Sequence, residues 1–448
     1  MVSCDVVVLG LGPGGEATAT ELAKAGLDVV GIDERLVGGE CPYFGCIPSK
    51  MIIRAADALA EARRIPGLAG SVDVRPDWAP VHARIRDEAT DDWDDAVAVE
   101  RLEQAGVTFV RGHGRLTGPR TVEVGGKTYE ASRGVVLNTG TRPAAPSIEG
   151  LTGTPYWTNR EVLQIDTLPS TLAVIGGGPI GAELAQALAR FGVRVTMIEI
   201  GPHLLGPVEP EAGELIGSVF GEEGIQVLTD ASIERVAYGD GQFTVVVDGQ
   251  DVVVEKLLVA AGRINNLDDI GLETVGLDPA ARSLEADDRM QVADGLWAIG
   301  DIVGKGAFTH MSMYQSAVAV ASVLGHDGPV ADYRAVPHVT FTDPEVGGVG
   351  LTEKQARDQG LSVRVGTTDL SVSSRGWIAK AQGLVKVVED ASRGVLVGAT
   401  VAGPAGGEIL GMLAVAVHAE VPVATLRSMI YAYPTLHRAV EEALKDLG

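Results

Sequence analysis

The sequence predicts an α/β protein with two Rossmann-type dinucleotide-binding domains. Two segments far apart in the chain each have the pattern of a buried strand, a glycine-rich turn and a helix. The chain of 448 residues is too long for one ordinary core and suits about three domains. Its 46% hydrophobic content and 58 glycines fit α/β units with glycine turns.

The first pattern opens the chain. A predicted buried strand at residues 6–9 leads into the run GLGPGG and a helix. Gly10 permits the turn, Gly12 lets the backbone approach a pyrophosphate, and Gly15 permits close packing. Asp33 ends the next predicted strand, where it is placed to hold a ribose hydroxyl. A glycine triplet alone also fits an ordinary turn, but Asp33 at this spacing favours a dinucleotide site.

The second pattern begins at residue 172. Its glycine run contains Gly176, Gly178 and Gly181. The next predicted strand ends at Glu199, whose carboxylate favours a free ribose 2′-hydroxyl over a 2′-phosphate, so NADH is the expected cofactor. NADPH stays open because His203 could contact a phosphate if its loop folds back. The alternative interpretation of Glu199 is a solvated carboxylate at a strand end.

A close cysteine pair, Cys41 and Cys46, follows the first unit in the run GGECPYFGCIPSK. Four intervening residues match one helical turn plus a tight loop, so the sulfurs can approach disulfide distance. A helix is predicted from Cys46 to Ala62, and its N-terminus would stabilise a thiolate. The alternative is a structural or zinc-binding pair, but no further Cys or paired His lies nearby at ligand spacing. Cys4 is expected to be inert packing.

Composition limits the partners. A net charge of −24 disfavours nucleic acid and anionic membranes, and 4% aromatic residues leave little to stack on bases. No signal-like start and no apolar run of about 18 residues is found, and three cysteines are few for an exported chain, so a cytoplasmic protein is expected. The acidic cluster at 87–95 is interpreted as the solvated face of a helical segment with no assigned role.

Several further motifs extend these observations along the chain. They are LNTGTRP at 137–143, AGRINN at 261–266, LWAIGD at 296–301, VTFTDPE at 339–345 and VGLTE at 349–353. With these motifs the sequence resembles the flavoprotein disulfide reductases of the pyridine nucleotide family, which include dihydrolipoamide dehydrogenase, glutathione reductase and mercuric reductase. The resemblance covers nearly the full length, and the motifs occur in the family's order.

The resemblance implies FAD on the first Rossmann unit, NAD(P)H on the second and a C-terminal α+β dimerisation domain. The expected FAD-binding domain comprises residues 1–150 and 265–335, the NAD(P)H-binding domain 151–264 and the dimerisation domain 336–448. The last should form an antiparallel sheet with helices. Its helix at 408–417 is apolar almost all round, as expected for a segment buried between subunits, so a homodimer is predicted.

The resemblance also assigns cofactor residues. Asp301 would bind the flavin ribityl chain, and Gly114, Thr139 and Gly140 would line the FAD site. His310 begins a helix directed at the flavin pyrimidine, although its ring could simply fill space. The other candidate cofactor residues are Gly14, Glu34, Gly39, Gly262 and Gly300.

The same resemblance assigns tasks around the cysteines. Cys46 would be the thiolate that exchanges electrons with FAD, and Cys41 would attack the substrate. Lys50 would lie near flavin N5 and pair with Glu183 of the nicotinamide domain, which would tune hydride acceptance.

The chain departs from the family near its C-terminus. Dihydrolipoamide dehydrogenases and glutathione reductases carry a His–Glu dyad there, and here Tyr433 replaces the histidine and Arg438 the glutamate. Tyrosine is a poor base at neutral pH, so efficient lipoamide chemistry is doubtful. Mercuric reductases resemble this chain in having tyrosine, but they also carry a C-terminal vicinal cysteine pair that is missing here. His437 would lie one helical turn beyond Tyr433 and could replace the base, or it is a surface histidine.

Three functions follow from these observations. In the first, NADH reduces FAD, FAD reduces the Cys41–Cys46 disulfide, and the dithiol reduces a small disulfide or soft metal species. In the second, electrons leave directly from flavin to a quinone or similar small molecule. In the third, the protein is a flavin-binding regulatory protein without turnover. In the predicted homodimer, Tyr433 and His437 would complete the partner's active site. The sequence does not identify the physiological acceptor.

Overall fold

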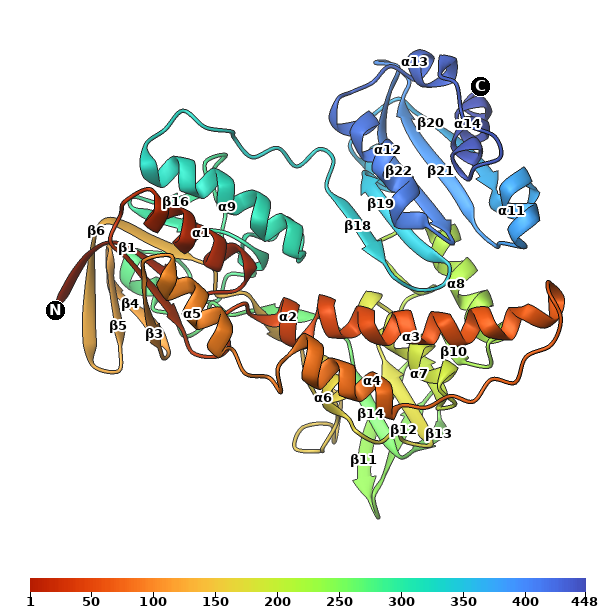
Figure 1. Ribbon diagram of the computed structural model, residues 1–448, viewed down its shortest axis with the longest axis horizontal. Coiled ribbons are helices and arrows are strands. Elements are labelled where there is room, and N and C mark those ends of the chain that lie inside the picture. Colours follow the sequence, from red (N-terminus) through yellow and green to blue (C-terminus); the bar gives the residue numbers. More distant parts are fainter. The chain divides into compact units, whose positions relative to one another are not determined.

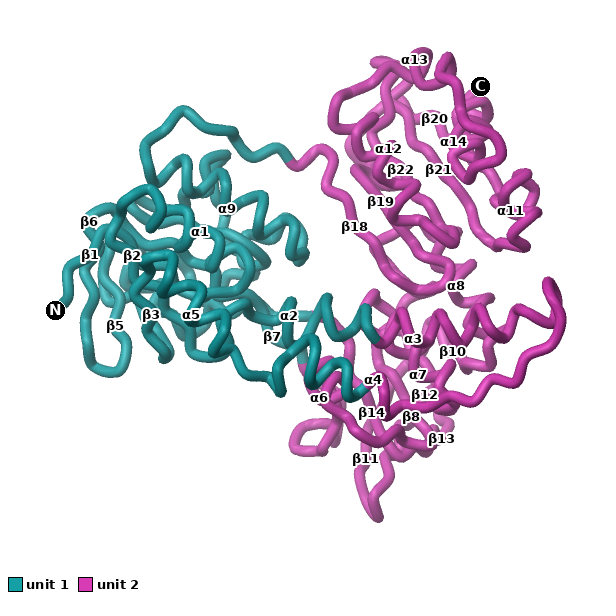
Figure 2. Tube along the Cα trace, in the orientation of Figure 1, with its two compact units in different colours: residues 1–51, 82–144, 263–332 teal, residues 52–81, 145–262, 333–448 magenta.

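The computed structural model describes all 448 residues, which divide into two compact units (Figure 2). Unit 1 comprises residues 1–51, 82–144 and 263–332, and unit 2 comprises residues 52–81, 145–262 and 333–448. The division falls within helix α3 (Cys46–Arg64), which confirms the helix predicted from Cys46.

Unit 1 is built on an eight-stranded sheet (Figure 1). Five parallel neighbours, β17-β6-β1-β2-β3, form its centre, and β16, β5 and β4 are antiparallel additions. The strands are β1 (Val2–Leu9), β2 (Val29–Asp33), β3 (Val107–Arg111), β4 (Gly114–Gly118), β5 (Thr121–Val124), β6 (Lys127–Leu137), β16 (Gln291–Ala293) and β17 (Leu296–Ala298). Residues 6–8 of β1 are completely buried, as expected for a parallel strand covered on both faces.

Helices α1 (Pro13–Lys24) and α9 (Thr309–Leu324) pack against each other within unit 1. Gly14 permits this close approach, because a Cβ there would lie 2.0 Å from Ser312 Oγ. The remaining elements of this unit are α2 (Glu40–Phe44), α5 (Ala96–Gln104), and the paired short strands β7 (Thr141–Pro143) and β15 (Arg263–Asn265). Helix α4 (Ala79–Arg84) crosses the division between the units.

Unit 2 contains the second predicted Rossmann pattern as the four-stranded parallel sheet β10-β9-β8-β14. A three-stranded antiparallel sheet, β11-β12-β13, accompanies it. The elements are α6 (Asn159–Gln164), β8 (Thr171–Ile175), α7 (Pro179–Arg190), β9 (Arg194–Ile198), α8 (Pro210–Glu222), β10 (Gln226–Leu228), β11 (Ile233–Gly239), β12 (Gln242–Val247), β13 (Gln250–Val254) and β14 (Lys256–Val259).

The C-terminal part of unit 2 is the predicted antiparallel sheet with helices, in the order β18-β19-β22-β21-β20. Its elements are β18 (Pro337–Thr340), β19 (Glu345–Gly350), α10 (Glu353–Asp358), β20 (Val363–Asp369), α11 (Ser374–Ala379), β21 (Leu384–Asp390), β22 (Val395–Gly403), α12 (Gly406–His418), α13 (Val423–Ser428) and α14 (His437–Asp446). Helix α12 buries Ile409 and Leu413 against this sheet, whereas Val415 is 63% exposed, so its apolar surface extends beyond the core.

Most carboxylates of residues 87–95 are exposed, as predicted, but the segment does not form one helical face and Asp95 is not solvated. A π-helical turn at Ile85–Ala89 gives way to left-handed backbone at Asp91–Trp93, and Asp95 is buried. The buried Asp95 side chain is satisfied, because its Oδ2 accepts hydrogen bonds from Val37 N and from the Arg111 guanidinium, each at 2.6 Å.

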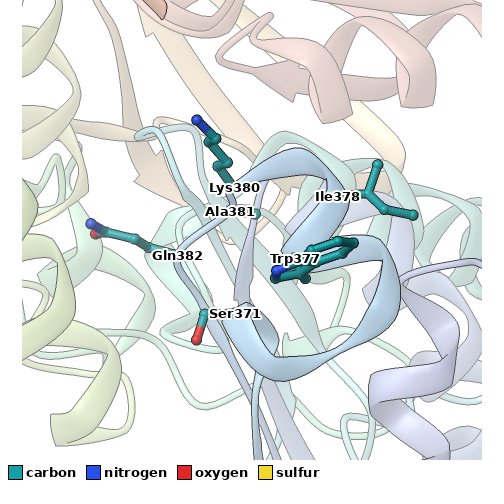
Figure 3. A pocket seen from close by; sticks show the side chains of 7 residues that line it. Ser371, Trp377, Ile378, Lys380, Ala381 and Gln382 are labelled. Carbon is teal, nitrogen blue, oxygen red and sulfur yellow. The ribbon is translucent and has the colours of Figure 1, made fainter. Parts of the chain in front are cut away.

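No helix is both long and apolar enough to cross a membrane, and no cluster of three or more His, Cys, Asp or Glu side chains could hold a metal ion. A depression on the C-terminal part of unit 2 lies around α11, where Trp377 and Ile378 are exposed (Figure 3). Its lining includes none of the predicted site residues.

Candidate active site

The cysteine pair lies on two successive short turns of unit 1. Cys41 is in α2, and Cys46 is the first residue of α3. Between them, Gly45 turns the chain so tightly that a Cβ there would lie 3.0 Å from Glu40 O. Both cysteines are free thiols in this structure, and each side chain shifts the pKa of the other. The structure thus brings together the two sulfurs, in a reduced state from which a local disulfide can form.

The surroundings of Cys46 favour its thiolate. The hydrogen bond from the Cys41 thiol, with further help from Thr309 and the Lys50 ammonium, lowers the pKa of Cys46 to about 5, against the opposing effect of burial. Thr309 Oγ1 lies 3.5 Å from Cys46 Sγ at the start of α9. The same hydrogen bond and burial raise the pKa of the Cys41 thiol strongly. At neutral pH, one sulfur of the pair carries the charge and the other carries the proton.

The first glycine turn has the geometry predicted for it. Gly10 has φ of +91°, and a Cβ on Gly15 would lie 2.0 Å from Gly10 O, so close packing requires both glycines. Asp33 Oδ2 accepts a hydrogen bond from Leu11 N at 2.7 Å, and Oδ1 accepts one from Arg35 N at 2.7 Å. Burial raises the pKa of Asp33, and these two backbone donors oppose the rise.

The second glycine turn repeats this arrangement. A Cβ on Gly181 would lie 2.0 Å from Gly176 O, and Gly176 has φ of +105°. Glu199 Oε2 accepts a hydrogen bond from Gly177 N at 2.6 Å, and Oε1 accepts one from Gly201 N at 2.7 Å. The strand-end carboxylate is therefore fixed at the mouth of the glycine turn, where a ribose would be bound.

Both turns fit the phosphates of a dinucleotide. Helices α1 and α7 begin after glycine N-caps, Gly12 and Gly178, and neither cap is satisfied by a side chain. A Cβ on Gly178 would meet nothing within 4 Å, so packing inside the protein does not explain this glycine. An open, uncapped helix N-terminus is a favourable site for phosphate, so the residues present fit FAD on the first turn and NAD(P)H on the second.

A buried polar chain surrounds Asp301, the residue predicted to bind the ribityl chain. Asp301 Oδ2 accepts from the Thr141 hydroxyl at 2.7 Å, and Arg263 Nε donates to the same Thr141 oxygen at 2.6 Å. Arg263 also lies 3.5 Å from Glu40, next to Cys41. Burial raises the pKa of Asp301, and Thr141 and Arg263 oppose it. Sequence analysis missed Thr141 and Arg263 as site residues, although both lie in motifs that it identified.

Internal packing requires some of the remaining candidate FAD-binding glycines but not others. A Cβ on Gly114 would lie 2.5 Å from Leu9 Cδ1, and one on Gly39 would lie 2.8 Å from Gly12 Cα, so packing already requires these glycines. Gly140, with φ of +64°, faces open space.

Three other predicted cofactor residues make local contacts, and a fourth, Gly262, faces open space. The Thr139 hydroxyl donates to Asn266 O at 2.8 Å, and Gly300 N donates to Gln315 Oε1 at 2.7 Å. Glu34 is hydrogen bonded to His113 Nδ1 at 2.9 Å, and Gly262 has φ of +114° with open space at its Cβ position. Their roles at a cofactor stay predictions.

Lys50 and Glu183 belong to different compact units. Lys50 lies one turn into α3, and its Nζ donates to Ser49 Oγ at 3.3 Å. Glu183 is buried on α7, where Oε1 accepts a hydrogen bond from Phe341 N at 2.8 Å. Their pairing stays a prediction. His310 is exposed and stacks on Phe308, with ring centroids 5.1 Å apart.

The predicted helical neighbourhood of Tyr433 and His437 is wrong. Helix α14 begins at His437, whereas Tyr433 lies in a turn before a cis peptide bond to Pro434. A residue before proline is disfavoured in helical conformation, and this explains why the helix starts later. Tyr433 is 71% exposed, and the Arg438 guanidinium lies 5.9 Å from its ring centroid.

Family models match almost the whole chain. The model described as pyridine nucleotide-disulphide oxidoreductase matches residues 4–321, and the model of the dimerisation domain of the same family matches residues 336–444. A dihydrolipoyl dehydrogenase of Thermus scotoductus is 34% identical over 470 residues, which cover 100% of this chain and 98% of the relative. A mercuric reductase of Acidithiobacillus ferrooxidans is 31% identical over 440 residues, with 96% and 80% covered.

Solved structures give the same assignment. LpdA from Mycobacterium tuberculosis superposes with a TM-score of 0.86 at 27% identity, covering 100% of both chains. The Cu(II) complex of the HOCl-induced flavoprotein disulfide reductase RclA from Escherichia coli gives a TM-score of 0.84 at 25% identity, with 100% and 99% covered. Together with the two glycine turns and the cysteine pair, these matches show that the chain belongs to the pyridine nucleotide-disulphide oxidoreductases, FAD-dependent enzymes that use NAD(P)H and act on sulfur groups.

Proposed function

We propose that this enzyme uses its Cys41–Cys46 dithiol to reduce a small disulfide or a soft metal ion. The observation that carries the proposal is the unequal state of the two sulfurs: Cys46 is stabilised as a thiolate, and Cys41 holds the shared proton. A structural cysteine pair has no need of this polarisation, whereas thiol–disulfide exchange depends on it.

The residues around the cysteines have separate tasks in this proposal. FAD, when bound, supplies hydride acceptance from NAD(P)H and electron transfer to sulfur. The first glycine turn, Asp33 and Asp301 would hold that cofactor. The Lys50 ammonium keeps Cys46 ionised, and the Thr309 hydroxyl donates to the same sulfur. These groups keep a negative charge on Cys46 and leave Cys41 to meet the acceptor.

Reduction of a disulfide then balances as an exchange. Cys41 loses its proton, and its sulfur attacks one sulfur of the acceptor, which forms a mixed disulfide and releases the first thiolate. Cys46 attacks the Cys41 sulfur, which closes the Cys41–Cys46 disulfide and releases the second thiolate. Two electrons pass from the dithiol to the acceptor, and the two released thiolates take up the Cys41 proton and one from water.

The C-terminal segment supports soft metal ions over lipoamide. The raised pKa of Cys41 calls for a base, but the chain has Tyr433 and Arg438 where related enzymes have a histidine and a glutamate. The Arg438 guanidinium forms an ion pair with the Glu441 carboxylate at 3.1 Å. A soft metal ion binds thiolates directly and displaces their protons, so it needs no such base. The Cu(II) complex of the similar RclA supports this acceptor class.

Two further parts of the proposal concern the nicotinamide cofactor and the assembly. Glu199 supports NADH, because both its oxygens are fixed by backbone donors. His203 Nδ1 lies 2.8 Å from Leu204 O, so one ring nitrogen is already engaged by neighbouring backbone, which disfavours a contact with a 2′-phosphate. The family's dimerisation domain and the exposed Ile430 and Tyr433 support a homodimer whose C-terminal segment completes the partner's site.

A quinone-type reductase is the second candidate. It is favoured by the replacement of the family's histidine with Tyr433, because slow sulfur chemistry would leave flavin as the point from which electrons depart. In that case the cysteines are secondary.

Anaerobic titration of the holoenzyme with NADH separates the two. We expect a long-wavelength thiolate-to-flavin charge-transfer band to appear before the flavin bleaches, because Cys46 is already ionised at neutral pH. Direct bleaching without this band would show that the cysteines lie outside the main electron path, and quinones would become the leading acceptors.

A further inference from the structure

The chain between residues 85 and 95 has an unusual backbone. After the π-helical turn at Ile85–Ala89, three successive residues have left-handed conformation: Asp91 with φ of 48°, Asp92 with 55° and Trp93 with 57°. Non-glycine residues rarely adopt this conformation, and an aromatic residue does so least readily. Such a segment persists only where its surroundings over-determine it, and it often marks a functional constraint.

Local hydrogen bonds hold this turn. Thr90 Oγ1 donates to Ile85 O at 3.0 Å and accepts a hydrogen bond from Trp93 N at 3.4 Å. Asp92 N donates to Arg86 O at 2.7 Å. The turn therefore has a defined shape, and that shape sets the direction of the Trp93 side chain.

Two side chains of this segment reach the loop that carries Cys41. Trp93 Nε1 donates to Tyr43 O at 3.1 Å, and Asp95 Oδ2 accepts from Val37 N at 2.6 Å. Tyr43 is among the last residues of α2, whose carbonyl groups have no partner within the helix, and the indole satisfies one of them. The Arg111 guanidinium compensates the charge of Asp95.

We propose that Trp93 and Asp95 are positioning residues that brace residues 37–43 and thereby hold the Cys41 thiol in place to donate its hydrogen bond to Cys46. Cys41 lies between the two attached backbone atoms, Val37 N and Tyr43 O. Hydrogen bonds weaken steeply with misalignment, so a small displacement of α2 is enough to weaken the one between the sulfurs. The acidic cluster thus supports the reactive cysteines through geometry.

This inference deepens the proposed function, and it rests on that function for its effect on turnover. The state of the thiols can be measured without turnover. The rate at which iodoacetamide alkylates Cys46 in the reduced holoenzyme, followed against pH by peptide mass spectrometry, gives the midpoint of thiolate formation. Cys41 and Lys50, the titratable and charged groups that act on Cys46, are unchanged in the variants below.

Trp93→Phe is the main test. It keeps the aromatic ring and removes only the indole N–H. We expect the midpoint of Cys46 to rise by about one pH unit relative to the wild-type protein, because the interaction with Cys41 that lowers the pKa of Cys46 is weakened. Trp78→Phe is the matched control: Trp78 Nε1 donates to Ile165 O at 2.9 Å, an equivalent indole-to-carbonyl bond whose acceptor lies outside residues 37–43. This control should leave the midpoint where it is.

Asp95→Ala distinguishes positioning from charge, because it removes both the carboxylate charge and the acceptor for Val37 N. If Asp95 acted only through its charge, its removal would lower the Cys46 midpoint, because a nearby negative charge disfavours a thiolate. A positioning role predicts a rise. The Asp95 variant also tests the positioning role if Trp93→Phe does not retain FAD. An unchanged or lowered midpoint of Cys46 thiolate formation in the folded variants would contradict the positioning role of Trp93 and Asp95. A wild-type protein whose Cys46 titrates normally, near 8.5, would instead overturn the proposed function.

Discussion

The two glycine turns of this enzyme are built alike, but they lead into different segments. In each, a strand-end carboxylate accepts a hydrogen bond from a backbone N–H 22 residues earlier: Asp33 from Leu11 N, and Glu199 from Gly177 N. In the first unit, the chain between β2 and β3 spans residues 34–106 and carries both reactive cysteines. In the second, β9 is followed by helix α8 and β10 alone. The binding unit is repeated, and the chemistry lies in the segment inserted after one copy.

The largest effect is expected from Cys46→Ser, which tests whether the chemistry depends on the segment between β2 and β3. It removes the thiolate from the inserted segment and leaves both glycine turns intact. We expect reduction of a small disulfide or soft metal ion to fall by roughly three orders of magnitude, because a serine hydroxyl is neither ionised nor able to exchange with sulfur. Reduction of bound FAD by NADH, followed by stopped flow, should continue. Retained acceptor reduction would mean that electrons leave from flavin.

Sequence reasoning found the parts of this enzyme that depend on local pattern. The strand and glycine turn around Gly10 and the cysteine pair follow from residues adjacent in the chain, so periodicity and spacing predicted them. Thr309, which is 263 residues from Cys46, has no such local signal. Its contact arises from the packing of α9 in the folded unit.

The prediction for the acidic segment was wrong at Asp95 for a related reason. Charge density correctly predicted solvation of most carboxylates at 87–95, but Asp95 is buried, where it is compensated by Arg111 and by a backbone N–H 58 residues away. At Tyr433, a periodicity argument joined two residues across Pro434, where the chain leaves helical conformation. Pattern reasoning is therefore least reliable where a tertiary partner or a proline decides the backbone.

Two glycine variants separate packing from cofactor binding at the second glycine turn. Gly181→Ala places a Cβ 2.0 Å from the Gly176 carbonyl oxygen, whereas Gly178→Ala places one in open space. We expect Gly181→Ala to lower the free energy of unfolding by about 3 kcal/mol, because backbone must shift to relieve the overlap. Gly178→Ala should unfold at the wild-type temperature but raise the KM for NADH several-fold, since the methyl group lies where a pyrophosphate would approach. Equal melting temperatures for both variants would contradict the packing argument.

The smallest expected effect distinguishes the two carboxylates. Glu199→Gln keeps an oxygen to accept from Gly177 N but removes the charge and the acceptor for Gly201 N, which costs about 1 kcal/mol of ribose binding, or roughly a fivefold rise in the KM for NADH. Because repulsion of a 2′-phosphate is also lost, the ratio of NADH to NADPH activity should narrow. Asp33→Asn should leave this ratio unchanged and weaken FAD retention, measured by the flavin-to-protein absorbance ratio after dialysis. If Asp33→Asn altered nicotinamide preference, the assignment of one cofactor to each turn would fail, and with it the view that the turns differ only in what they bind.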